Sequence, residues 1–462
     1  MSIYDKLNEQ QKEGVFTTEG AVLILAGAGS GKTGVLTHRI AHLIDDLGVN
    51  SYNILAITFT NKAAKEMKER VDRLVGMGAD SAWIMTFHAA CVRILRRYIC
   101  RIGYDNNFTI YDTDDQKSVI KDILKRKNLD PKQYKDRTIL SVISNAKDNL
   151  ISPDDMYQSS GGNYNTMKTA EIYREYQEQL KKNNAVDFDD IIGLTVKLFN
   201  EDKEVLRYYQ ERFRYIMVDE YQDTNTAQFE LIRLLAAGTR NLCVVGDDDQ
   251  GLYRFRGATI RNILEFPGHF AEGECKQVKL VTNYRSERQI IDFYNKWMST
   301  TDGRAYDFMW KNFRFEKKIV PPEGKKDAKV GVIKCSGKDL LDDWYEQVYS
   351  FITQLKSSGV LTDYNQIAVL CKSVKGDKII GMVEYLEEHG IKVYSPRSEM
   401  FFERKEIKQV IGCMILCFPE YVRKLQQRDF SYDFENLYNY YDTQCIAAAR
   451  ELILQYLSLI HI

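Results

Sequence analysis

Four short apolar runs punctuate the chain, at residues 21–25, 54–58, 215–218 and 242–245. Almost every position in them is hydrophobic, which is typical of parallel strands covered on both faces. We therefore predict one parallel-stranded core from these four segments. Two further runs, near 330–334 and 366–370, predict strands of a second α/β region that begins at about residue 277.

A different pattern fills residues 91 to 185, where charged residues alternate with apolar ones at helical spacing. Turn signals interrupt it at 152–154, Ser-Pro-Asp, and at 159–163, Ser-Ser-Gly-Gly-Asn. We predict a helical subdomain inserted into the parallel-stranded core.

The first apolar run leads directly into a glycine-rich turn that ends in Gly-Lys-Thr. A strand, a glycine-rich loop and a helix N-terminus together offer backbone N–H groups, a helix dipole and one lysine to a polyphosphate. The loop predicts a nucleoside triphosphate site made by Ala26, Gly27, Ala28, Gly29, Ser30, Gly31, Lys32 and Thr33. Ala26 stands where the usual pattern begins with glycine.

The third run is followed at once by Asp219 and Glu220. Open α/β sheets bind ligands at the carboxyl ends of their strands. We predict that Asp219 meets Mg²⁺ beside the Thr33 hydroxyl and that Glu220 polarises the attacking water.

Several segments together resemble the UvrD/Rep/PcrA group of superfamily 1 DNA helicases, in the order of that family's motifs. The matching segments are Leu7, Asn8 and Gln11, then 58–64, 86–93, 186–190, 219–225, 244–258, 283–286 and 401–408. The resemblance spans roughly residues 1 to 410. It implies an α/β P-loop NTPase with a RecA-like parallel sheet, an inserted helical subdomain and an incomplete second RecA-like domain.

The resemblance also implies roles in ATP hydrolysis. Lys32 neutralises the β- and γ-phosphates, Thr33 and Asp219 hold Mg²⁺, and Glu220 is the base. Gln250 senses the γ-phosphate, and Arg285 reaches it from the opposite lobe as an arginine finger. Adenine lies against Tyr284, while Gln11 and Arg39 read its edge.

On the DNA side, the resemblance implies stacking of bases on aromatic rings. The stacking residues are Phe59, His88, Tyr253 and Phe255, and Asn61 is a further DNA-binding residue. Phe255 stands where the family commonly has tryptophan, and Gly251 and Arg254 also depart from its commonest pattern. Basic residues follow two of these motifs at helical spacing, Lys62 to Arg73 and Arg93 to Arg101.

In domain terms, the resemblance implies a RecA-like domain 1A at 1–90 with 186–276 and a helical domain 1B at 91–185. Residues 277–410 correspond to part of domain 2A, and 411–462 to the start of helical domain 2B. The family's motifs V and VI do not occur in the sequence, so we expect the chain to be an N-terminal piece. Its last six residues also match one frame of a sequencing adapter, the alternative being a genuine helical tail. We expect such a piece to bind Mg-ATP, to hydrolyse it feebly and to unwind no duplex.

Composition adds little to this interpretation. The chain has 462 residues, a net charge of −1, 44% hydrophobic and 28% charged residues, so a DNA surface must be a local patch. Its nine cysteines contain no C-x-x-C pair, which argues for reduced thiols. No signal peptide or bilayer-length apolar run is seen, so we expect a cytoplasmic protein without membrane contact.

The expected function is ATP-dependent 3′→5′ movement on single-stranded DNA and at duplex junctions, in DNA repair or replication. Two alternatives stay open: the ATPase part of a helicase–nuclease subunit, and a nucleic-acid-binding ATPase that does not unwind. A complete motif V and VI in a longer sequence would distinguish them.

Overall fold

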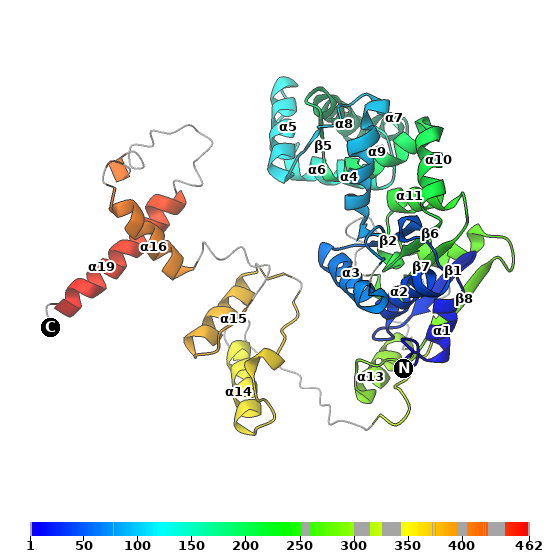
Figure 1. The fold of residues 1–462 in the computed structure, drawn as a ribbon. Helices are drawn as coiled ribbons and strands as arrows, with labels where there is room; N and C mark the ends of the chain where they lie inside the picture. Colours follow the sequence, from blue (N-terminus) through cyan, green and yellow to red (C-terminus); the bar gives the residue numbers. More distant parts are fainter. Residues whose placement is uncertain are drawn as a thin grey trace. The chain divides into compact units, whose positions relative to one another are not determined.

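The computed structural model describes residues 2–76, 78–251, 259–299, 315–325, 343–371, 376–394, 404–418 and 439–460, with a few single residues between them. The chain divides into two compact units, residues 1–330 and 331–462. The first unit is mixed α/β around a parallel sheet (Figure 1).

Six strands form the sheet of the first unit, in the order β3-β2-β6-β7-β1-β8 and all parallel. Their bounds are β1 Ala21–Ala26, β2 Ile54–Thr58, β3 Trp83–Thr86, β6 Tyr215–Val218, β7 Leu242–Gly246 and β8 Cys275–Leu280. The four predicted strands are confirmed within one residue. The boundary predicted between 276 and 277 falls inside β8.

Alternate residues of each central strand enter two different hydrophobic cores. Leu23 and Leu25 of β1 face one core, whereas Val22 and Ile24 face the other. Helices cover both faces, which explains why the strand sequences are apolar throughout rather than alternating.

On one face lie α1 Glu9–Phe16, α2 Lys32–Ala41 and α3 Asn61–Val75. On the other lie α4 Phe87–Tyr98, α9 Phe188–Glu201, α10 Lys203–Arg212, α11 Thr226–Ala236 and the short α12 Arg261–Leu264. Side chains cap several of these helices, including Thr60 at α3 and Asn225 at α11. The helix α13, Arg288–Ser299, follows β8.

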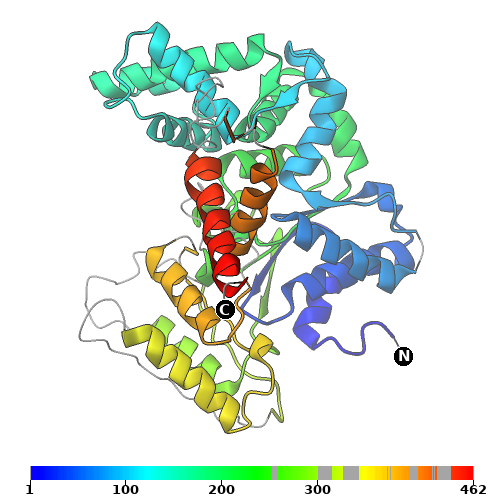
Figure 2. The ribbon, with the colours of Figure 1, turned by 90° about the vertical axis from the view of Figure 1, so that its left-hand side faces the viewer.

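The stretch predicted as helical, 91–185, begins within α4 on the sheet and continues in four helices, α5 Thr113–Arg126, α6 Asp136–Asp148, α7 Pro153–Gln158 and α8 Tyr164–Lys182. These four helices lie side by side around their own core, which includes Ile120, Ile143 and Tyr176 (Figure 2). The residues just before α5 and just after α8 form a two-stranded parallel sheet, β4 Thr109–Ile110 and β5 Ala185–Val186.

In the second unit, α14 Asp343–Ser357 and α15 Asp377–Glu388 enclose a small core with Ile352 and Met382. Helix α16, Lys405–Leu416, packs on the π-helical η10, Asn439–Ile446, and on α19, Ala447–Ile460.

The strand predicted near 366–370 is wrong. Tyr364–Gln366 form a 3-10 turn, and the following residues are irregular, with Leu370 95% exposed. A strand needs a neighbouring ladder, and none of the described residues supplies one here. The strand predicted near 330–334 lies outside the described residues.

The helices that the structure describes include none long and apolar enough to cross a membrane.

Candidate nucleotide and DNA site

The glycine-rich loop lies between β1 and α2. Gly29 and Gly31 have φ angles of +70° and +86°, which side chains rarely adopt. Gly31 is the N-cap of α2, and no side chain caps the helix there. The first N–H groups of α2 therefore remain available to an anion at the helix N-terminus.

A second segment of the first unit packs closely against this loop. A Cβ on Gly27 would lie 2.0 Å from Ile319 Cδ1, and one on Gly29 would lie 2.4 Å from Asn283 Oδ1. The Tyr284 N–H also donates to the Gly29 carbonyl at 2.9 Å. The loop thus needs glycine at these positions because neighbouring groups leave no room for a side chain.

The carboxyl ends of β1 and β6 bring together the four residues predicted to hydrolyse ATP. Lys32 Nζ lies 2.6 Å from Glu220 Oε2, and Thr33 Oγ1 lies 3.2 Å from Asp219 Oδ2. Residues almost two hundred positions apart therefore form one site, at the sheet edge where ligands bind in α/β folds.

The Asp219 carboxyl is 3% exposed. Burial raises its pKa to about 6, and the neighbouring Glu220 charge adds to this effect, while Lys32 and hydrogen bonds oppose it. A buried carboxylate beside a hydroxyl is the oxygen donor set that Mg²⁺ prefers. Asp219 and Thr33 therefore fit the metal that the family pattern implies.

Glu220 has a left-handed backbone, with φ of 50°. Such a conformation is uncommon for a residue other than glycine and clusters at functional sites. Its Oε2 also accepts a hydrogen bond from Gln222 Nε2 at 3.0 Å. The carboxylate is thus held at a defined point beside the loop.

Gln250 and Arg285 lie in neighbouring segments. Gln250 Nε2 donates to Asp247 Oδ2 at 2.5 Å, at the end of β7. Arg285 is exposed, and its Cβ lies beside Gly29, since a Cβ there would be 2.9 Å away. Their predicted roles toward the γ-phosphate stay predictions.

The residues predicted to bind adenine occupy two environments. Gln11 Nε2 donates to the Ser30 carbonyl at 2.9 Å, and the Tyr284 hydroxyl accepts from Asn8 Nδ2 at 2.8 Å. Arg39 is 2% exposed and donates to the carbonyls of Gly14, Thr17 and Thr18. Arg39 thus anchors the turn after α1, and its reading of the base stays a prediction.

Of the predicted DNA contacts, Phe59 is half-buried, with its ring 5.5 Å from that of Phe87. Asn61 is exposed at the start of α3. Tyr253 and Phe255 lie outside the described residues.

His88 forms a stack that the residue pattern did not reveal. Its ring lies 3.7 Å from the Phe188 ring at 22°, and Phe188 is 54% exposed. Burial lowers the pKa of His88 to about 4, so the imidazole is neutral near pH 7. Phe188 lies in the matching segment 186–190, but the sequence does not reveal that its ring is exposed at the start of α9 beside His88.

The two basic segments differ in their surroundings. On α3, Lys62 and Lys65 are exposed and form only long i,i+4 pairs with glutamates. On α4, Arg93 and Arg96 instead stack on the rings of Trp83 and Phe108. The helix α3 therefore offers the freer positive face.

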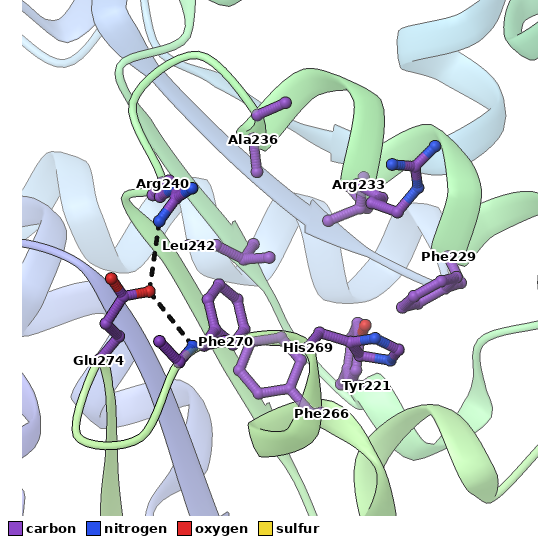
Figure 3. Close-up of a pocket in the computed structure, with 13 residues that line it drawn as sticks. Tyr221, Phe229, Arg233, Ala236, Arg240, Leu242, Phe266, His269, Phe270 and Glu274 are labelled. Carbon is purple, nitrogen blue, oxygen red and sulfur yellow. Dashed lines mark hydrogen bonds and ion pairs between the residues drawn. The ribbon is translucent and has the colours of Figure 1, made fainter.

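A separate hollow of about 570 Å³ lies between α11 and the segment 266–274. Figure 3 shows the rings of Tyr221, Phe229, Phe266 and Phe270 in its wall and the ion pair of Arg240 with Glu274 at its rim. The predicted phosphate-binding residues do not line this hollow, so it is distinct from the nucleotide site.

Comparison with known families supports the sequence interpretation. The family described as "UvrD/REP helicase N-terminal domain" matches residues 7–271, and "UvrD-like helicase C-terminal domain" matches 278–424.

Among curated relatives, the "ATP-dependent DNA helicase PcrA" of Bacillus subtilis is 43% identical over 433 residues, covering 94% of this chain and 55% of the relative. The proteins of the same name from Staphylococcus epidermidis and Staphylococcus aureus are 44% identical, covering 89% of this chain and 54% and 53% of their own lengths. The chain spans about half the length of these relatives.

Proposed function

Since the chain belongs to the UvrD/REP helicase family, we propose that it binds Mg-ATP at the loop 26–33 and hydrolyses it on single-stranded DNA. For the whole protein we propose 3′→5′ movement along the strand and separation of duplex junctions, in DNA repair or replication. The relatives named ATP-dependent DNA helicases support this proposal.

One observation carries the proposal, namely the contacts of Lys32 with Glu220 and of Thr33 with Asp219 at one sheet edge. In this structure, the Lys32 ammonium is paired with the Glu220 carboxylate. A triphosphate in the loop would draw the ammonium to its oxygens and leave the Glu220 carboxylate to accept a proton from water. When bound, Mg²⁺ would supply charge neutralisation at the phosphates, held by Thr33 and Asp219.

We assign the remaining predicted residues to three tasks. Gln250 and Arg285 respond to the γ-phosphate, because a polar or charged group that contacts it favours the closed state only while ATP is present. Gln11, Arg39 and Tyr284 hold the adenine. Phe59, Asn61, His88, Tyr253 and Phe255 contact the DNA, with Phe188 added by its stack on His88.

ATP hydrolysis by the 462-residue chain, with and without a thymidine oligonucleotide, tests the proposal. We expect Lys32→Ala to weaken binding of a fluorescent ATP analogue and to abolish hydrolysis, because the phosphates lose their lysine. Lys12→Ala is the control, since Lys12 pairs with the exposed Glu9 on α1. Hydrolysis that survives in Lys32→Ala would overturn the proposal.

Strand displacement tests the helicase part. Two duplexes of one sequence, one with a 3′ tail and one with a 5′ tail, are compared. We expect any displacement to require the 3′ tail. DNA-stimulated hydrolysis with no displacement by a longer form of the protein would instead favour an ATPase that does not unwind.

A further inference from the structure

Lys317 is a buried lysine that the function above does not use. Its side chain is 2% exposed, and its ammonium contacts three successive aspartates at the end of β7. The distance to Asp247 Oδ1 is 2.5 Å and that to Asp249 Oδ2 is 3.3 Å, with Asp248 Oδ1 as the third partner. The Asp247 and Asp248 side chains are fully buried.

The three carboxylates could by their geometry surround a cation, since their oxygens lie within 4.8 Å of one another. The Lys317 ammonium already contacts all three of them. Burial alone would lower the pKa of Lys317, but the charges of Asp247, Asp248 and Asp249 raise it, so the lysine is charged. The ammonium thus offsets part of the mutual repulsion of the three carboxylates.

From Asp247, hydrogen bonds lead to two of the predicted catalytic groups. Gln250 Nε2 donates to Asp247 Oδ2 at 2.5 Å. The Asp247 N–H donates to Gln222 Oε1 at 3.0 Å, and Gln222 Nε2 donates to Glu220 Oε2 at 3.0 Å. Lys317 is therefore connected through Asp247 to the predicted γ-phosphate sensor, Gln250, and to the predicted base, Glu220.

The segment that carries Lys317 is itself fixed on both sides. The Phe315 N–H donates to Asp248 Oδ2 at 3.0 Å, and Ile319 fills the space beside Gly27 in the phosphate loop. The Val320 carbonyl accepts from the Asn283 N–H at 2.8 Å. The segment 315–320 thus joins the phosphate loop to the end of β7.

We propose that Lys317 is a positioning residue of the ATPase site, which holds Asp247 so that Gln250 and, through Gln222, Glu220 are aimed at the nucleotide. This inference rests on the proposed function, because it assigns Lys317 to the same reaction. Without Lys317, the Asp247 carboxylate would turn away from its charged neighbours. Gln250 would then lose its carboxylate partner, and Gln222, which accepts from the Asp247 backbone N–H, would be held less firmly as this residue shifts.

The test compares Lys317→Met with Lys318→Met, the control at an exposed neighbouring lysine. Affinity is measured with a fluorescent ATP analogue and Mg²⁺, and hydrolysis in a single turnover with oligonucleotide present. We expect Lys317→Met to slow hydrolysis by about tenfold or more while the affinity changes by less than about threefold, because the phosphate-binding groups are untouched. Lys318→Met should match the parent in both.

A double variant separates positioning from stability. Lys317→Met combined with Asp248→Asn removes one of the charges that the lysine neutralises, so its melting temperature should recover toward that of the parent. Hydrolysis should stay slow, because Asp247 still lacks its lysine.

Parental hydrolysis in folded Lys317→Met, or hydrolysis that recovers with the melting temperature in the double variant, would overturn the inference. The proposed function is judged separately, by the parent against Lys32→Ala.

Discussion

Two lysines of the first unit pair with carboxylates in opposite ways. At the carboxyl ends of β1 and β6, which we call the nucleotide edge, Lys32 has Glu220 as its ion-pair partner. The Glu220 side chain is 36% exposed. Between α6 and the start of α9, Lys147 contacts Asp187 at 2.6 Å and Asp190 at 2.8 Å, with all three side chains at most 5% exposed. The Tyr176 hydroxyl donates to Asp187 as well.

The difference shows that a lysine–carboxylate pair can serve either ligand exchange, as at Lys32, or stability, as at Lys147. Burial alone would lower the pKa of Lys147, but the charges of Asp190 and Asp187 raise it above its ordinary value. One buried ammonium serves two buried carboxylates, so exchanging a partner for a ligand would leave a buried charge unpaired. Lys32 can exchange Glu220 for phosphate, because the Glu220 side chain is 36% exposed and can be solvated once released.

The largest effect should follow from Glu220→Gln, which breaks the pair at the nucleotide edge. Hydrolysis should fall by about 100- to 10,000-fold, the usual contribution of a general base. ATP binding should persist, because Lys32 and the α2 N-terminus keep their phosphate contacts. The measurements are single-turnover hydrolysis and analogue binding.

Glu274→Gln is the control for Glu220→Gln, since Glu274 pairs with Arg240 at the rim of the separate hollow. Equal turnover in Glu220→Gln and the parent would remove Glu220 from the role of base.

Breaking the Lys147 pair between α6 and α9 should instead lower the free energy of unfolding. Lys147→Met leaves Asp187 and Asp190 buried without their cation, which typically costs about 3–5 kcal/mol of unfolding free energy. Urea unfolding measures this loss. Lys197→Met on α9 is the control, because its pair with Glu201 is half-exposed and is worth less than about 1 kcal/mol. Equal losses in both variants would contradict the comparison.

Much of the nucleotide edge could be predicted from the sequence, because local pattern and sheet geometry determine it. Strands that are apolar throughout identified β1, β2, β6 and β7, and the rule for strand ends placed Asp219 near Thr33. The edge strand β8 escaped because it alternates and is half-exposed, with the sequence CKQVKL.

The partners of buried charges could not be predicted in the same way. Lys147 lies 40 positions before Asp187, and Lys317 lies 70 positions after Asp247. Neither lysine stands in a local pattern that distinguishes it from an exposed one, and only the packing of distant segments buries it. The stack of Phe188 on His88 depends on tertiary packing in the same way.

A smaller effect tests whether Phe188, which follows the buried Asp187, contributes to DNA binding. Asp187 caps α9, and Phe188 is the first residue of that helix. If Phe188 stacks on a base, Phe188→Ala should weaken single-strand binding by about 1–3 kcal/mol, since the ring is lost while the ion pairs remain. Fluorescence anisotropy with a labelled oligonucleotide measures the change.

Tyr164→Ala, at an exposed aromatic residue on α8, is the control for Phe188→Ala. Unchanged DNA affinity together with a lower melting temperature would assign Phe188 to packing alone.

The smallest effect concerns Asp148, which links the two regions. It follows Lys147 at the end of α6 and accepts a hydrogen bond at 2.5 Å from Asn225, the residue that caps α11. Burial raises the pKa of Asp148 to about 7 from an ordinary value of 3.8, and the Asp189 charge adds to this effect. Asp148 is thus a part-buried carboxylate whose hydrogen bond comes from a neutral amide, whereas Asp187 contacts a lysine.

Between these two pKa values the folded state holds a proton that the unfolded state has released. The contribution of Asp148 to the free energy of unfolding must therefore fall as the pH rises through this window and level off above about pH 7. Asp148→Asn cannot ionise, and its side-chain oxygen can still accept from Asn225. We expect its melting temperature to exceed that of the parent near pH 8 and to approach it near pH 4, as measured by thermal unfolding across this range. A constant difference at every pH would mean that the effect is one of packing, and that the unmatched carboxylate costs the fold nothing.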